Sequence, residues 1–213
     1  MPTPEFVLRL REKIGHDQLW LPGVSVVVVD DAGRILLGRR SDTGRWSIID
    51  GIPEPGEQPA AAAARECEEE ASVRPEILAV ISVETEEPLS YPNGDRCVFL
   101  DIGFVARAGA ERAAAAGVGD GELTAVAWFA PDALPAPLTP HASARIAAAR
   151  PDLHPALAAN PTVYPDLVDW LRTSPDPAVQ AALARRANAS VQPTLAQAAD
   201  PAASADSDLS WLI

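Results

Sequence analysis

The sequence is poor in cysteine and in positive charge, and each shortage excludes a class of protein. Cys67 and Cys97 are the only cysteines in 213 residues, so no disulfide framework is available. Both are expected to be small core residues, which suits a reducing compartment. Lysine and arginine number 17 against 30 acidic residues, which gives a formal net charge of -13. A chain this acidic is not expected to bind a nucleic-acid backbone or an anionic membrane, because both require a basic face.

The sequence also lacks a long hydrophobic run. Its longest apolar stretch, VSVVVV at 24–29, is far shorter than the roughly 20 residues that cross a bilayer. The first residues, MPTPEFVLRLREKIGHDQ, mix charges with apolar side chains and do not resemble a signal peptide. We therefore expect a cytoplasmic protein.

The apolar pattern predicts strands with one strong helix between them. Strands are expected over residues 24–29, 34–40, 77–84, 96–107 and 123–129, and helices over 4–14 and 59–71. The DDAG stretch at 30–33 predicts a hairpin turn, and Pro59 suits the first turn of the second helix. The predicted fold class is α+β, an α/β/α sandwich with a mixed sheet.

Alanine and proline dominate after about Pro135, and this part is predicted to form a small all-α module. Short helices are expected over 140–150, 153–159, 165–172 and 177–187. The segments PDLHPALAANP and PDPAVQAALARR look like imperfect copies of a helical repeat. Two copies are fewer than a free-standing solenoid needs, so the module is expected to lean on the first domain or on a partner. Its Arg145, His141 and His154 show no ligand spacing and are interpreted as surface or capping residues.

Glutamates crowd the stretch GIPEPGEQPAAAAARECEEEASV at 51–73. On a helix, Glu66, Glu69 and Glu70 share one face, and the preceding EPGE loop can bring Glu57 toward it. Small residues form the opposite face, which can pack on a sheet: Ala60, Ala63, Ala64, Cys67 and Ala71. Crowded carboxylates destabilise a helix unless a divalent cation binds them, and Mg²⁺ or Mn²⁺ prefers such oxygens. The spacing describes a metal site, with a solvated acidic face as the alternative.

The same stretch resembles the signature of the Nudix hydrolases, G-x5-E-x7-R-E-U-x-E-E-x-G-U, where U is aliphatic. The residues on its fixed positions are Gly51, Glu57, Arg65, Glu66, Glu69, Glu70 and Val73. Two residues depart from the pattern, because Cys67 occupies an aliphatic position and Ser72 replaces the last glycine. The resemblance extends over roughly residues 20–135 and does not cover the C-terminal module.

This resemblance implies an α/β/α sandwich that cleaves a nucleoside diphosphate linked to another group, using Mg²⁺ or Mn²⁺. It implies that Glu66, Glu69 and Glu70 bind the metal and that Glu57 joins or orients them. The carbonyl of Gly51 would also reach a metal. Each of these positions matches the pattern in this chain.

Arg65 is implied to steer a carboxylate through a bidentate salt bridge. Asp50 stands where many members have a second glycine, which adds a carboxylate near the site. Ser72 lacks the tolerance of glycine for positive φ, which costs roughly 1 kcal/mol if the helix end keeps that conformation. Neither departure removes a ligand, so an active enzyme is expected.

The reaction also needs a carboxylate that takes a proton from water. In the family this acid commonly lies in a loop before the last strands. Glu122 is the candidate in GVGDGELTAVAWF, with Asp120 second, and a plain acidic turn is the alternative. The catalytic residues expected are therefore Glu69, Glu122 and Arg65.

Arg39 and Arg40 end a strand, and only one of them is expected to point toward the site and hold a phosphate. Arg40 is favoured over Arg39, with a surface ion pair as the alternative for either. Trp20 and Trp46 could stack on a base, although a tryptophan at a strand end is more often ordinary packing. Base stacking and ordinary packing therefore remain the two alternatives for Trp20 and for Trp46.

YPNGD at 91–95 resembles a loop in a Nudix group close to the ADP-ribose and nucleoside-diphosphate-sugar hydrolases. Tyr91 or Asp95 would then contact the substrate, and a plain hairpin is the alternative. The predicted function is metal-dependent hydrolysis of a nucleoside diphosphate linked to another moiety, of the ADP-ribose or nucleotide-sugar type. The alternatives are a nucleoside triphosphate pyrophosphohydrolase that sanitises nucleotides, and a nucleotide-sensing Nudix domain without turnover.

The predicted organisation has four parts: an N-terminal helix over 1–19, a Nudix domain over 20–138, a helical module over 139–187 and a disordered tail over 188–213. The module resembles variant leucine-rich repeats seen in actinobacterial proteins, which implies a surface for an unknown protein. A small-molecule nucleotide is the expected substrate. Dimers are frequent in the family, so a homodimer is a further expectation.

Overall fold

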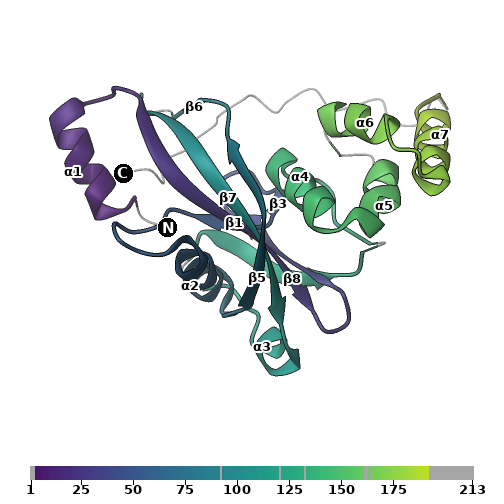
Figure 1. The fold of residues 1–213 in the computed structure, drawn as a ribbon, viewed down its shortest axis with the longest axis horizontal. Coiled ribbons are helices and arrows are strands. Elements are labelled where there is room, and N and C mark those ends of the chain that lie inside the picture. The colour runs from purple at the N-terminus through teal and green to yellow at the C-terminus, as the bar shows by residue number, and fades with distance from the viewer. Residues whose placement is uncertain are drawn as a thin grey trace, which may run out of the picture.

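The computed structural model describes residues 3–91, 93–119, 121–131, 133–160, 163 and 165–191 (Figure 1). Its strands are β1 (Leu19–Asp30), β2 (Ile35–Arg40), β3 (Trp46–Ser47), β4 (Ile49–Gly51), β5 (Glu76–Thr85), β6 (Leu89–Ser90), β7 (Arg96–Ala108) and β8 (Leu123–Phe129). They form one eight-stranded sheet in the order β3-β2-β1-β7-β5, with β4 paired to β1, β6 to β7 and β8 to β2. Because β1 and β7 run parallel whereas β1 and β2 run antiparallel, the predicted mixed sheet is confirmed.

Helices lie on both faces of this sheet. They are α1 (Glu5–Ile14), α2 (Pro59–Ala71), α3 (Ala110–Ala114), α4 (Pro140–Ala149), α5 (His154–Ala159), α6 (Pro165–Arg172) and α7 (Pro177–Val191). Helix α2 covers one face and α4 the other, and α5 to α7 continue from α4 away from the sheet (Figure 1). This arrangement confirms the predicted α+β sandwich with additional C-terminal helices.

Strand β1 is buried on both of its faces. Val24, Val26 and Val28 belong to the hydrophobic cluster under α2, whereas Val27 and Val29 pack in the cluster under α4. A strand buried on both faces reads as a continuous apolar run rather than an alternation. The VSVVVV stretch therefore marks the centre of the sheet.

Helix α2 packs on the sheet through small side chains. Its buried small residues are Ala62, Ala63, Ala64, Cys67 and Ala71. Ala60, which was expected on this face, lies in the first turn and is exposed. The close packing of alanines against β1 and β4 fixes where the glutamates of the same helix emerge.

Ser72 ends α2 with φ 56° and ψ 24°, and it is the only non-glycine residue with positive φ in the described ranges. Its N–H donates to the carbonyl of Glu68 at 3.1 Å, and the N–H of Val73 donates to the carbonyl of Cys67 at 3.1 Å. These two bonds form the Schellman closure that usually has glycine at this position. The serine therefore keeps the conformation of the glycine that it replaces.

The C-terminal helices share a hydrophobic cluster with the sheet. Buried members include Val27, Ile35 and Leu37 from the sheet and Leu157 and Leu171 from the helices. The module thus leans on the sheet, as its small number of repeat copies predicts. The boundary between residues 138 and 139 stays a prediction, and this shared cluster has members on both sides of it.

Helix α7 extends to Val191, beyond the predicted end at 187. The tail predicted over 188–213 falls from residue 192 onward outside the described residues. Within the described part of the chain, none of the helices combines the length and the apolar character that a membrane crossing requires.

Candidate active site

Gly51 ends β4 directly against the side chain of Glu66. A Cβ added to Gly51 would overlap the carboxyl group of Glu66, so a side chain at this position would displace Glu66. The glycine is required by this close approach rather than by an unusual φ. It places the backbone of β4 beside the middle of α2.

Arg65 on α2 binds three of the glutamates. Its Nε and Nη2 donate to the two carboxylate oxygens of Glu57 at 3.0 and 2.9 Å, in a bidentate pair. Its Nη1 lies 2.9 Å from Glu69 Oε2 and 3.0 Å from Glu66 Oε1. The hydrogen bonds from Arg65 hold the pKa of Glu57 below its usual value. The bidentate salt bridge implied for Arg65 is thus present in the structure.

Glu66 and Glu70 are buried, whereas Glu69 is half exposed. Glu66 is 0% exposed and Glu70 is 6% exposed, so a solvated acidic face does not describe these two residues. Burial raises the pKa of Glu66 to about 7, although the charge of Arg65 acts in the opposite direction. Within the described residues, neither oxygen of Glu66 has a hydrogen bond, despite the short distance to Arg65.

We refer to Glu57, Glu66, Glu69 and Glu70 as the box carboxylates. They fit a hard divalent cation, because all offer oxygens and because a buried carboxylate without a hydrogen bond is costly unless a cation binds it. Within the described residues, no three of the box carboxylates bring one oxygen each to within 4.8 Å of one another. Arg65 holds Glu57 and Glu69 in ion pairs instead.

The loop before β8 is fastened to the C-terminal end of α2. The N–H groups of Gly117 and Gly119 donate to the carbonyls of Ala71 and Glu70 at 3.0 and 2.9 Å. Gly119 lies so close that an added Cβ would overlap the carbonyl of Glu69. This loop leads to the half-buried Glu122, whose carbonyl accepts from the N–H of Ser41 at 2.9 Å. Asp120 lies outside the described residues.

Arg40 has acidic neighbours near the site, Asp50 and the box carboxylate Glu70 among them. Arg40 donates to both oxygens of Asp42 at 3.0 and 2.9 Å, and its Nη1 lies 3.8 Å from Asp50 Oδ1. Burial lowers the pKa of Arg40, but Asp42, Asp50 and Glu70 together outweigh burial and raise it. Arg39 is exposed and donates to the carbonyl of Gly44 at 3.0 Å.

Trp46 is part of the core rather than an open surface. Its ring meets Phe129 edge to face, with centroids 4.8 Å apart and planes at 76°. It also packs against the cluster under α4. The structure thus places Trp46 in the packing role that was the alternative to base stacking, whereas Trp20 on β1 is exposed.

The YPNGD hairpin is fastened to the N-terminal helix. Asp95 Oδ1 lies 3.1 Å from Arg11 Nε and 2.8 Å from His16 Nδ1. Tyr91 packs against the cluster under α1, and burial raises the pKa of Tyr91 to about 12. Asp95 thus has structural partners on α1 and on the segment that follows it.

A polar cluster on the α4 face was not predicted from the sequence. Arg145 was interpreted as a surface or capping residue, and this is wrong, because its side chain is 3% exposed and pairs with Glu84, Glu86 and Asp101. These partners lie 44 to 61 residues away along the chain, so local spacing gives no signal of them. His154 does cap α4, since its Nε2 lies 3.0 Å from the carbonyl of Ala147.

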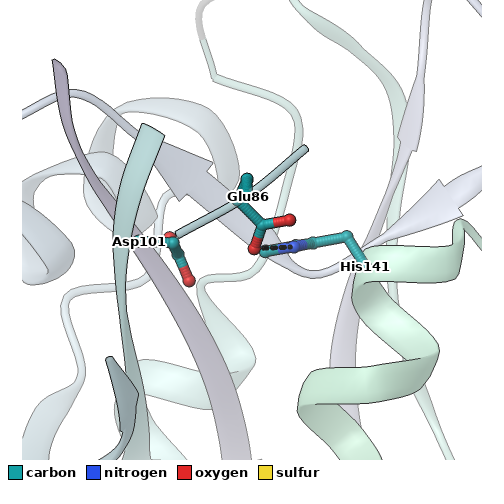
Figure 2. Close-up of side chains that lie close together, drawn as sticks. All are labelled: Glu86, Asp101 and His141. Atoms are coloured by element: carbon teal, nitrogen blue, oxygen red, sulfur yellow. Dashed lines mark ion pairs between the residues drawn. The ribbon is translucent and has the colours of Figure 1, made fainter. Parts of the chain in front are cut away.

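His141 belongs to the same cluster, with its Nδ1 3.4 Å from Glu86 Oε1 (Figure 2). Burial lowers the pKa of His141, but the hydrogen bond with Glu86 and nearby acidic charges outweigh it and raise the pKa. The side chain is 27% exposed and is directed toward Glu86, so the surface interpretation of His141 is wrong as well.

The chain matches known proteins over both of its parts. Residues 19–149 match the family described as NUDIX domain, and residues 129–187 match the family described as Leucine Rich Repeat Variant domain. Among solved structures, a MutT NUDIX hydrolase from Burkholderia pseudomallei is 28% identical with a TM-score of 0.49, and the match covers 60% of this chain and 96% of that one.

Two curated relatives match part of this chain. An RNA pyrophosphohydrolase from Roseobacter denitrificans is 37% identical over 91 residues, which cover 42% of this chain and 51% of that protein. A MutT-like protein from Streptomyces ambofaciens is 36% identical over 110 residues, which cover 51% of this chain and 63% of that protein. The chain therefore spans between half and two thirds of the length of these relatives.

A third relative is a CMP-5'-(N-acetyl-N-hydroxy-3-aminopropyl)phosphonate hydrolase from Streptomyces rubellomurinus. It is 39% identical over 69 residues, which cover 30% of this chain and 34% of that protein. The C-terminal match supports the resemblance to variant leucine-rich repeats. Because the first family match covers more than half of the sequence, the chain belongs to the NUDIX domain family.

Proposed function

We propose that this chain hydrolyses the diphosphate bond of a nucleoside diphosphate linked to a second moiety, with Mg²⁺ or Mn²⁺ as cofactor. The observation that carries the proposal is the carboxylate of Glu66, fully buried and without a hydrogen bond in the described ranges, between Gly51 and Arg65. Membership of the family supports it, since Nudix enzymes generally use divalent metal ions.

The box carboxylates would hold the cation, together with the carbonyl of Gly51. A cation bound there neutralises phosphate charge and lowers the pKa of a bound water. Arg65 orients Glu57 and Glu69 through its ion pairs, so that their oxygens are positioned before substrate arrives.

Two residues outside α2 would act on the substrate. Arg40 is half-buried beside Asp50 and would bind a phosphate through its planar guanidinium. Glu122 would accept the proton of the attacking water. The pairing of Arg40 with Leu123 places Glu122 next to the end of β2, which supports a shared role for these two residues.

The names of the relatives favour two substrate classes. One relative is named for CMP joined to a phosphonate, which is a nucleotide linked to a second moiety, as in the leading proposal. Another is named RNA pyrophosphohydrolase, which favours release of pyrophosphate as the second candidate. The proposal of an ADP-ribose or nucleotide-sugar substrate is based on the resemblance of the YPNGD loop.

A substrate panel with each cation tests the proposal. The panel contains ADP-ribose, nucleotide sugars and nucleoside triphosphates, and the products are separated by chromatography. Nucleoside monophosphate with a phosphorylated second moiety supports the leading candidate, whereas monophosphate with pyrophosphate supports the second. A folded chain that turns over no member of the panel rejects both.

Glu69→Gln separates an enzyme from a nucleotide sensor. We expect it to lower turnover by at least about 100-fold while nucleotide still binds, because it removes a metal ligand. Glu68→Gln is the matched control, since Glu68 lies on the same helix but is exposed and pairs with Arg74. Turnover that survives the Glu69 change would show that the assignment of the ligands is wrong.

A further inference from the structure

A second group of ligand-type side chains lies on the α4 face of the sheet, opposite the face that α2 covers. Glu86 follows β5, Asp101 lies on β7 and His141 lies in the first turn of α4. Figure 2 shows the three side chains facing one another from these separate elements. Each offers one ligand atom, and the three atoms lie within 4.8 Å of one another.

The negative charge of this cluster exceeds its positive charge. The guanidinium of Arg145 is paired with the carboxylates of Glu84, Glu86 and Asp101. With a neutral His141, three carboxylates and one guanidinium leave two negative charges in excess. Glu84 is 60% exposed and solvated, but the side chain of Asp101 is only 6% exposed. Arg145 is the buried counter-charge of Asp101, and the half-exposed Glu86 shares the same guanidinium, so the group as a whole stays negatively charged.

Arg145 forms ion pairs with only one oxygen of Glu86 and only one oxygen of Asp101. Its Nη2 lies 2.7 Å from Glu86 Oε1 and 2.8 Å from Asp101 Oδ2. Ser25 Oγ donates to the same oxygen of Asp101 at 2.7 Å. Among the described residues, no hydrogen bond reaches Asp101 Oδ1 or Glu86 Oε2. Asp101 therefore keeps one oxygen, Oδ1, that neither Arg145 nor Ser25 engages.

We propose that Glu86, Asp101 and His141 bind a divalent transition-metal ion, with Zn²⁺ as the best fit, at a site separate from the box carboxylates. One imidazole nitrogen and two carboxylate oxygens suit a borderline ion such as Zn²⁺, whereas Mg²⁺ prefers oxygen ligands alone. Ligands of one zinc ion lie about 3.5 Å apart. The side chains of Glu86 and His141 are half-exposed, so both can move by the small distance that brings the three ligand atoms around one ion.

The ion would join α4 to the sheet. It would connect the segment after β5, strand β7 and the first turn of α4, which are distant in the sequence and meet only in the folded chain. Such a link would hold the start of the C-terminal helices in place. The site depends on neither the substrate nor the metal of the proposed reaction, so its test is independent of turnover.

Zinc binding by the full chain is measured by equilibrium dialysis in excess Mg²⁺, at about pH 8 so that the imidazole is neutral. We expect one zinc ion per chain, and we expect His141→Ala and Glu86→Gln each to weaken zinc binding by at least about tenfold. His16→Ala is the matched control, because His16 Nδ1 lies 2.8 Å from Asp95 and, within the described part of the chain, has no second carboxylate partner. Glu69→Gln is expected to leave zinc binding unchanged.

A readout without substitutions complements the dialysis. In nitrogen NMR of the wild-type chain, zinc is expected to shift the ring resonances of His141 and to leave those of His16 in place. The proposal is overturned if the wild-type chain binds no zinc, if His141 and Glu86 variants bind zinc as the wild type does, or if Glu69→Gln abolishes the binding. Zinc that leaves the His141 ring unshifted overturns it as well.

Discussion

Ser72 adopts a left-handed backbone conformation that costs a residue with a Cβ roughly 1 kcal/mol relative to glycine. Its side chain is exposed, and its φ of 56° is imposed by the Schellman closure of α2. We expect Ser72→Gly to raise the free energy of unfolding by about 1 kcal/mol. Urea unfolding of the two chains measures the difference.

Ser72→Ala is the control for this change, because alanine keeps the Cβ and removes the hydroxyl. It is expected to leave the free energy of unfolding within about 0.5 kcal/mol of the wild type. A glycine variant no more stable than the alanine variant would contradict the strain assigned to Ser72.

Glu66 makes the stability of the metal-free chain depend on pH. Its pKa lies at about 7 in the folded chain, against an ordinary value of 4.5. Between these values the folded chain keeps a proton that the unfolded chain releases, so the contribution of Glu66 to the free energy of unfolding falls as pH rises. At about 1.4 kcal/mol per pKa unit, the fall amounts to at most about 3.5 kcal/mol.

Urea unfolding of the wild type and Glu66→Gln, each in the presence of a chelator, measures this dependence. Other carboxylates also titrate, so the quantity compared is the difference between the two chains from about pH 5 to pH 8. We expect the wild type to lose stability relative to the glutamine variant over this range. A constant difference would show that Glu66 ionises as it does in the unfolded chain.

At the residue scale, sequence alone predicts what depends on neighbours in the chain. The shared helix face of Glu66 and Glu70 and the strain at Ser72 follow from positions a few residues apart. The burial of Arg145 does not, because its carboxylate partners come from β5, β7 and the segment between β5 and β6. An arginine among alanines reads as a surface residue until the sheet beneath it is known.

Among the elements, α4 depends most on buried charge. Arg145 is its buried link to the sheet, and Asp101 has lost most of its contact with water. We expect Arg145→Ala to lower the free energy of unfolding by about 3 kcal/mol, because it leaves a buried carboxylate without its cation. Arg150→Ala, at the exposed pair with Asp152, is expected to cost less than about 1 kcal/mol.

Chemical denaturation of both arginine variants tests this difference. Equal losses in the two variants would mean that the buried pairs of Arg145 contribute no more than a surface ion pair. A much larger loss for Arg145→Ala would show that α4 is held to the sheet by charge as well as by its apolar face.

Element boundaries were predictable where they are set locally. Helix α2 begins at Pro59 and ends before Ser72, as its proline and its closing motif predict. Strand β1 begins at Leu19, five residues before the expected start at Val24, because its first residues pair with β7 from Cys97 onward. The short strands β3 and β4 were not among the expected strands, and they form through pairing with β2 and β1.

For the whole molecule, the shared cluster predicts that the sheet and the C-terminal helices unfold together. Leu157 on α5 is 0% exposed and belongs to the same cluster as Val27 on β1. We expect Leu157→Ala to lower the free energy of unfolding by about 2 to 5 kcal/mol, through lost burial and a cavity. Because one core serves both parts, amide hydrogen exchange should quicken in β1 and β7 as well as in α5 to α7.

Leu78→Ala provides the matched control, since Leu78 on β5 is 55% exposed and its truncation creates no cavity. It is expected to change neither stability nor exchange appreciably. If Leu157→Ala quickens exchange in α5 to α7 alone, the helices are a separate cooperative unit that rests on the sheet. If exchange quickens throughout, the Nudix fold depends on the C-terminal helices for part of its stability, and the two family matches describe one folded body.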